Sequence, residues 1–265
     1  APVIISPSLL AADWSDMKGE VQKCLDAGLS WIHIDVFDGV YIDSPYALTF
    51  GPQMVGCIAE QFADRRQAEE DGLTLDVHLC VERPERYARP MADAGATRLI
   101  FQWEAMMGSR DDDDHVDVND GDVSSALDSA VAFASTINSL GMKCGVSINP
   151  ETPVAMIYPL LETGLVDLVD ILAVQPGFGG QEFDHVAIEK IGMLRRYIDE
   201  ELNAIRGGSG GDPATEGVVV RILVDGGIHR GTSSWVKRAG ADILVAGTAL
   251  FRHSQGFEAG VRELI

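Results

Sequence analysis

Eight short runs of apolar and β-branched residues alternate along the chain with longer segments of helical periodicity. The eight runs are almost continuously apolar, which is expected of parallel strands that are buried on both faces. The length of 265 residues is sufficient for one large barrel, or for two small domains. Together these observations predict an α/β fold, a (β/α)8 or TIM barrel, in which residues 1–265 form a single domain.

The order of elements follows from the apolar periodicity and from the residues that begin and end helices. Asp13 is a predicted N-cap and Gly28 a helix stop, Pro84 occupies a first turn, and Gly95 and Gly141 follow helix ends. The predicted strands cover residues 3–9, 30–36, 73–79, 97–103, 142–148, 167–174, 218–224 and 243–246. The predicted helices cover residues 14–27, 51–62, 84–94, 124–140, 154–162, 186–204, 232–239 and 255–264.

The main alternative to the barrel is a doubly wound open sheet. That fold usually has a glycine-rich dinucleotide-binding turn after its first strand, whereas this chain has Ser6, Pro7 and Ser8 there. Two segments are predicted to be insertions. Residues 108–122 are rich in Asp and favour a solvated loop over a calcium site, and residues 206–217 are rich in Gly.

The composition excludes several classes of function. The net charge is −21, with 20 Lys and Arg against 41 Asp and Glu, so no nucleic acid is expected as a partner. No apolar run approaches the ~20 residues that cross a bilayer, so no membrane partner is expected either. Four widely spaced cysteines predict free thiols and a reducing compartment, the cytoplasm or alternatively the plastid stroma. The cysteines are Cys24, Cys57, Cys80 and Cys144.

Polar side chains interrupt the apolar strands near their carboxyl ends, where the active sites of barrels lie. His33 and Asp35 are two positions apart and therefore face the same way in a strand. His78 lies near the end of the third strand and Asp225 at the end of the seventh. Two imidazoles and two carboxylates suit a divalent metal such as zinc, manganese, ferrous iron or cobalt.

A simpler interpretation applies to each of these residues alone. A single His in a strand is usually a hydrogen-bonded core residue, and a single Asp after a strand is usually a helix cap or a loop residue. Asp38 and Asp76 are interpreted in this second way, with Asp38 serving the turn before Gly39. Agreement among three separate strand ends favours the metal site, because burying carboxylates without a cation is costly.

Glycines follow the last three strands and predict a phosphate-binding site. Exposed backbone N–H groups bind phosphate without Lys or Arg, which is compatible with an acidic chain. If these glycines instead serve only tight turns, no ligand is implied. The residues are Gly177, Phe178, Gly179 and Gly180 after the sixth strand, Gly226 and Gly227 after the seventh, and Gly247 and Thr248 after the eighth.

Seven stretches resemble the ribulose-phosphate 3-epimerase family, in the family's order. They are SPSLLAAD at 6–13, HIDVFDG at 33–39, DVHL at 76–79, NPETP at 149–153, PGFGGQ at 176–181, VDGGI at 224–228 and VAGTA at 245–249.

The resemblance implies interconversion of D-ribulose 5-phosphate and D-xylulose 5-phosphate through an enediolate that a divalent metal stabilises. It implies that His33, Asp35, His78 and Asp225 bind this metal, and that Asp35 and Asp225 are the catalytic acid and base. Ser8 and His78 would contact the sugar, and the glycine loops its phosphate. No organic cofactor is implied, and a homo-oligomer is expected.

Several positions depart from the family's usual pattern. Phe37, Cys80 and Leu172 replace methionines that pack around the sugar, and Gln102 and Gln175 replace a His and an Asn or Glu. The loop at residues 40–47 also differs. These departures leave alternatives open: a hexulose 6-phosphate (allulose 6-phosphate) 3-epimerase, a catalytically inactive phosphate-binding barrel, or a metal-dependent hydrolase.

Overall fold

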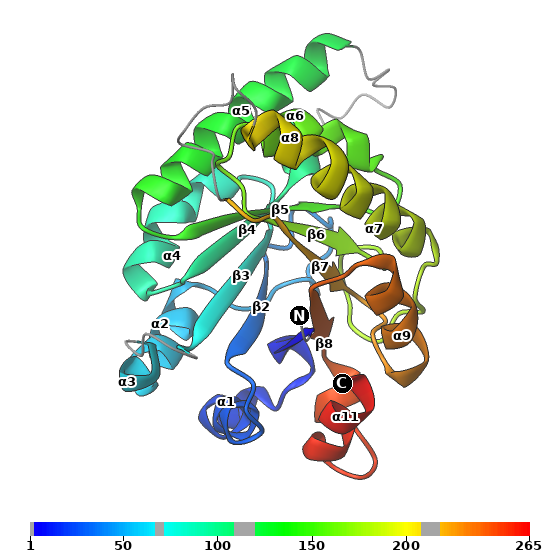
Figure 1. Cartoon of the computed structure of the whole chain (residues 1–265). Coiled ribbons are helices and arrows are strands. Elements are labelled where there is room, and N and C mark those ends of the chain that lie inside the picture. Colours follow the sequence, from blue (N-terminus) through cyan, green and yellow to red (C-terminus); the bar gives the residue numbers. More distant parts are fainter. Residues whose placement is uncertain (1–2, 67–71, 109–119, 208–217) are drawn as a thin grey trace.

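A computed structural model describes residues 3–66, 72–108, 120–207 and 218–265 and confirms the barrel (Figure 1). All strand pairs are parallel, in the order β1-β8-β7-β6-β5-β4-β3-β2. A parallel bridge between Ser8 and His33 joins β1 to β2. The strands are β1 (Ile4–Pro7), β2 (Trp31–Phe37), β3 (Thr74–Cys80), β4 (Arg98–Gln102), β5 (Lys143–Ile148), β6 (Leu168–Leu172), β7 (Arg221–Asp225) and β8 (Ile243–Ala246).

Helices surround the strands, and α8 lies beside α6 in the view of Figure 1. Both labelled chain ends lie near β8 in that view. The α-helices are α1 (Met17–Asp26), α2 (Pro52–Gln61), α3 (Ala63–Arg66), α4 (Ala88–Ala94), α5 (Asp120–Ser139), α6 (Tyr158–Glu162), α7 (Val186–Arg196), α8 (Asn203–Gly207), α9 (Arg230–Ala239), α10 (Thr248–Phe251) and α11 (Phe257–Leu264).

The predicted boundaries differ from the observed ones mainly at helix ends. Asp13 caps a short 3-10 turn over Trp14–Asp16, and the N-cap of α1 is Asp16, whose carboxylate accepts a hydrogen bond from Gly19 N. The predicted helix at residues 186–204 is divided by a π-helical turn over Tyr197–Leu202. Gly95 ends α4 with a φ of 93°, a left-handed conformation that glycine adopts without strain.

The barrel interior is apolar in its middle, and charged side chains lie toward both ends of the strands. Buried side chains from β4, β6, β7 and β8 form a cluster separate from the core under the helices. The Arg98 and Arg221 guanidinium groups lie 5.6 and 5.8 Å from the centroid of the Trp31 ring, at the amino ends of their strands. The interior cluster consists of Ile100, Leu168, Leu223, Ile243 and Val245.

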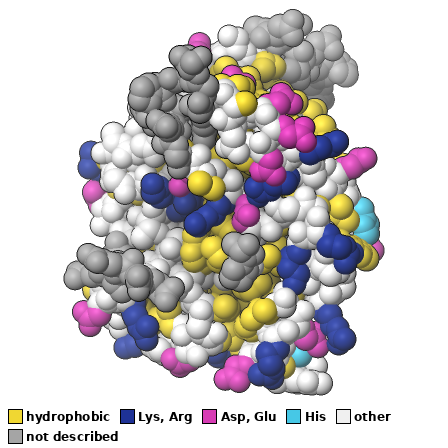
Figure 2. All heavy atoms as spheres, viewed as in Figure 1, with side chains coloured by type: hydrophobic (Ala, Val, Ile, Leu, Met, Phe, Trp, Pro, Cys, Tyr) yellow, Lys and Arg dark blue, Asp and Glu magenta, His cyan; other side chains and the backbone are white. Residues whose placement is uncertain are grey.

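Both predicted insertions fall largely on residues 109–119 and 208–217, which lie outside the described part of the chain. None of the helices in the described ranges has the length and apolar character that crossing a membrane requires. All four cysteines are free thiols, as predicted. On the face drawn in Figure 2, basic and acidic side chains are interspersed and hydrophobic atoms gather near the middle.

Candidate metal centre and active site

The four predicted metal ligands come together at the carboxyl ends of β2, β3 and β7. One ligand atom from each of His33, Asp35, His78 and Asp225 lies within 4.8 Å of the others. Asp35 Oδ1 is 3.2 Å from His33 Nε2 and 3.4 Å from His78 Nδ1. His33 Nε2 is 3.8 Å from Asp225 Oδ2. Both imidazoles and Asp35 are buried, and 19% of the Asp225 side chain remains exposed toward the cavity.

The two carboxylates have opposite electrostatic environments. Burial tends to raise the pKa of Asp35, but the His33 and His78 imidazoles outweigh burial and lower it. Burial and the nearby Asp35 carboxylate raise the pKa of Asp225 to about 7. A divalent cation would relieve the repulsion between the two acids, and two imidazoles with two carboxylates are donors that such a cation accepts. These residues therefore fit a metal of this kind.

Asp76 orients the His33 imidazole from the side opposite the candidate ligands. Its Oδ2 is 3.0 Å from His33 Nδ1, which leaves Nε2 facing the other three candidate ligands. The second Asp76 oxygen, Oδ1, lies 4.0 Å from Arg98 Nε. The interpretation of Asp76 as a cap or loop residue is therefore wrong, because it is fully buried inside β3. A carboxylate behind a metal-binding imidazole fixes its orientation and increases its basicity.

Asp38 has the turn role that the sequence predicts. Its Oδ1 accepts hydrogen bonds from Val40 N and Tyr41 N, and its Oδ2 accepts one from Glu82 N. The Asp38 side chain therefore ties the loop after β2 to the loop after β3.

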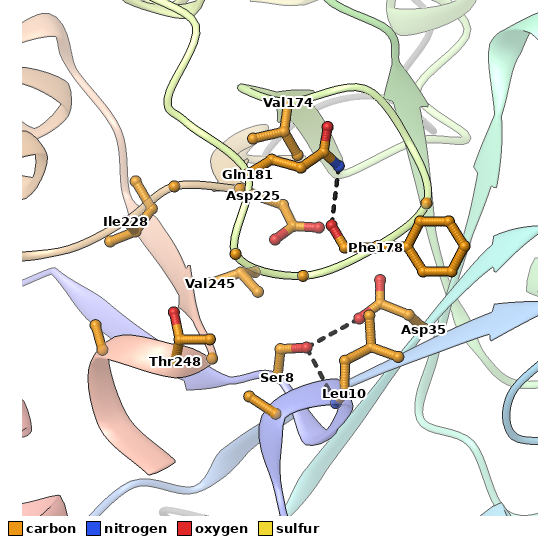
Figure 3. Close-up of a pocket in the computed structure, with 18 of the residues that line it drawn as sticks. Ser8, Leu10, Asp35, Val174, Phe178, Gln181, Asp225, Ile228, Val245 and Thr248 are labelled. Carbon is orange, nitrogen blue, oxygen red and sulfur yellow. Dashed lines mark hydrogen bonds between the residues drawn. The ribbon is translucent and has the colours of Figure 1, made fainter. Parts of the chain in front are cut away.

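A cavity of about 1040 Å³ opens above the candidate ligands. The carboxylates of Asp35 and Asp225 point into it (Figure 3). Ser8 Oγ donates a hydrogen bond of 3.0 Å to Asp35 Oδ2, which places the hydroxyl at the cavity wall. Every residue predicted to contact substrate lines this cavity, as do Phe37, Cys80 and Leu172. The predicted contacts are Ser8, His78, Gly177, Phe178, Gly179, Gly180, Gly226, Gly227, Gly247 and Thr248.

The glycine loop after β6 is braced by a side chain that sequence reasoning did not single out. Gln181 Nε2 donates hydrogen bonds to the carbonyl oxygens of Gln175, at 2.7 Å, and Phe178, at 2.9 Å. The second of these is drawn in Figure 3. Gly180 has a φ of 83°, so glycine suits the turn that precedes Gln181.

Two side chains, Lys190 and Glu104, hold the turn after β5. Lys190 Nζ donates to the carbonyl oxygens of Asn149 and Pro150, at 2.6 and 3.1 Å. Glu104 accepts hydrogen bonds from Asn149 N and from the Thr152 hydroxyl. Sequence reasoning missed the roles of Lys190 and Glu104, because both lie far along the chain from the NPETP stretch that they hold.

The stability contributed by Lys190 is expected to rise with pH. Burial lowers the pKa of this lysine to about 8 from an ordinary value of 10.5. Between these two values the unfolded chain binds more protons than the folded chain, so the free energy of unfolding increases with pH. Chemical denaturation measures the free energy of unfolding of the wild type and of Lys190→Met. The value for the wild type should rise relative to that of the variant from about pH 7 to about pH 10. A difference independent of pH would contradict this.

Comparison with known proteins identifies the family. The profile of the ribulose-phosphate 3-epimerase family matches residues 4–251, nearly the whole chain. The chain belongs to the ribulose-phosphate 3-epimerase family. Ribulose-phosphate 3-epimerase of Synechocystis sp. is 34% identical over 262 residues, which cover 98% of this chain and 93% of that protein. The cytoplasmic isoform of Oryza sativa subsp. japonica is 30% identical over 248 residues, covering 93% and 86%.

A solved structure supports the fold independently of close sequence similarity. A mutant tryptophan synthase α-subunit from Pyrococcus furiosus superimposes with a TM-score of 0.57 at 15% identity. The match covers 99% of this epimerase-family chain and 97% of the α-subunit. At this identity the likeness shows the fold and carries no argument about the reaction.

Proposed function

We propose that this chain is a metal-dependent 3-epimerase that interconverts D-ribulose 5-phosphate and D-xylulose 5-phosphate. The observation that carries the proposal is the pair Asp35 and Asp225, which face one cavity beside two imidazoles. Inverting a carbon next to a carbonyl requires removing a proton from one face and delivering a proton to the other. Two carboxyl groups of opposite protonation state are suited to this task.

In the proposed mechanism, the ionised acid removes the proton at C3 of the sugar and the protonated acid supplies one from the opposite face. The position of Asp35 and Asp225 beside one another, both bordering the cavity, supports this division. Ser8 keeps the Asp35 carboxylate directed at the cavity through its hydrogen bond. A divalent metal on His33, Asp35, His78 and Asp225 would stabilise negative charge on the substrate oxygens. This chemistry requires no organic cofactor.

The glycine loops are proposed to hold the phosphate, away from the reacting carbon. The loops after β6, β7 and β8 all border the cavity that Asp35 and Asp225 face. Binding energy from the phosphate would then hold C3 between the two acids. The proposed partner is thus a small sugar phosphate. Assembly into a homo-oligomer and residence in the cytoplasm, or alternatively the plastid stroma, stay predictions.

A comparison of substrates tests this proposal. The enzyme loaded with a divalent metal should turn over D-ribulose 5-phosphate with a much higher kcat/KM than allulose 6-phosphate or unphosphorylated D-ribulose. Loss of the phosphate should mainly raise KM, because the glycine loops are proposed to bind the phosphate and the two acids to transfer the protons. A preference for the hexulose phosphate would indicate that Phe37, Cys80 and Leu172 set a different sugar specificity. Release of inorganic phosphate would indicate a hydrolase instead.

A further inference from the structure

A further buried carboxylate, Asp170, lies beside the candidate metal ligand His78 and has no role in the two-acid chemistry. It lies within β6, between Leu168 and Leu172, and is fully buried. Ser147 Oγ donates a hydrogen bond of 2.8 Å to Asp170 Oδ2. Among the residues that the structure describes, Oδ1 of Asp170 has no hydrogen-bond partner. A buried carboxylate with one neutral donor destabilises a folded chain unless it serves a ligand.

Asp170 faces the metal site through His78. Its Oδ2 lies 3.7 Å from His78 Nδ1. The same nitrogen lies 3.4 Å from Asp35 Oδ1, so Nδ1 is directed toward the other candidate ligands. Asp170 therefore places a negative charge on the side of His78 that faces the proposed metal, and not on its outer side.

The two imidazoles thus each have a buried carboxylate besides the candidate ligands. Asp76 is hydrogen-bonded to His33 and has Arg98 within 4.0 Å of its second oxygen. Asp170 has only a hydroxyl as its hydrogen-bonding partner among the described residues. A guanidinium thus lies beside Asp76, whereas Asp170 faces the His78 imidazole, where a cation bound at the site would balance its charge.

We infer that Asp170 is a positioning residue of the metal site, which increases the affinity for a divalent cation through its charge beside His78. This inference rests on the metal dependence of the proposed function. A nearby negative charge in a low-dielectric interior attracts a dication strongly even without direct coordination. The chain therefore retains a poorly partnered carboxylate that lowers the stability of the metal-free protein and favours the metal-loaded one.

Metal titration of the chelator-treated protein tests the inference without any sugar. Competition with a fluorescent chelator should show that Asp170→Asn weakens Mn²⁺ and Zn²⁺ binding by about 10- to 100-fold. Asp170→Leu should weaken both similarly, and Ser147→Ala less, because it leaves the charge in place. Asp93→Asn, an exposed partner of Arg89, is the matched control and should bind both metals as the wild type does.

Thermal denaturation separates a metal role from a structural one. Metal-free Asp170→Leu should melt no lower than the metal-free wild type, because an apolar side chain replaces an incompletely partnered carboxylate. The rise in melting temperature on adding Mn²⁺ should be smaller in this variant than in the wild type. A purely structural Asp170 would give the reverse, a lower melting temperature with unchanged metal affinity.

The possible outcomes distinguish failure of the inference about Asp170 from failure of the proposed function. Unchanged metal affinity in both Asp170 variants would overturn the inference and leave the proposed function intact. Binding that depends on Asp170, in a wild type that turns over no sugar phosphate, would support the inference and contradict the proposed function. A wild type that binds neither metal would overturn both.

Discussion

Replacing either Asp35 or Asp225 by Asn is expected to lower kcat for D-ribulose 5-phosphate by at least about 100-fold while the barrel remains folded. Asn keeps the shape of the side chain and one oxygen that can coordinate a metal. It neither accepts nor supplies the C3 proton. Because each acid serves one face of C3, both epimerisation directions fail in either variant. Steady-state turnover of the two variants, with metal content measured for each, provides the test.

Hydrogen exchange in deuterated water sharpens this prediction. Each variant keeps one working acid, so it should exchange the C3 proton of one epimer only, and the two variants should differ in which epimer exchanges. Asp93→Asn, on the exposed surface of α4, should behave as the wild type. Near-normal turnover in either site variant, or exchange of both epimers by one variant, would contradict the two-acid mechanism.

Gly227→Ala is expected to raise KM for the sugar phosphate by about 10-fold or more, the loss of at least one good hydrogen bond to phosphate. Gly227 has a φ of 63°, and an added Cβ would lie 2.8 Å from Phe183 Cα, a backbone atom that cannot move alone. The loops after β6 and β7 must then separate, which disturbs the proposed phosphate site. Steady-state kinetics should show a larger change in KM than in kcat.

Gly28→Ala is the matched control for this prediction. Gly28 also has a positive φ, 78°, but a Cβ there meets nothing within 4 Å, and the residue lies after α1. Its substitution carries the backbone penalty of about 1–2 kcal/mol in stability without a change in KM. Equal KM values for Gly227→Ala and the wild type would contradict the proposed phosphate site.

Most of the fold follows from local sequence patterns. Strands buried on both faces leave long apolar runs, and Gly95 and Gly141 mark helix ends because only glycine adopts the left-handed conformation readily. The short helix α10 and the π-helical turn after α7 were not predicted, since packing against neighbouring helices decides such details. Helix propensity alone does not distinguish a π-helical turn from a continuous helix.

The sequence predicts those parts of the candidate site in which side chains two positions apart share one face of a strand. His33 and Asp35 share a face by spacing, and the structure brings His78 and Asp225 to them from other strands. The same period places Asp76 on the face of His78, a signal that the interpretation as a cap overlooked. Asp170 also interrupts an apolar strand, but its nearness to His78 depends on the closure of the barrel, which sequence spacing does not report.

The most direct test of the account is epimerisation of D-ribulose 5-phosphate by the purified chain, by the chain after chelation, and after adding back zinc, manganese, cobalt or ferrous iron. The account predicts formation of D-xylulose 5-phosphate that chelation abolishes and at least one of these metals restores. Full activity after complete removal of the metal would contradict the assignment of His33, Asp35, His78 and Asp225 as its ligands. Absence of epimerisation with every metal would contradict the proposed reaction.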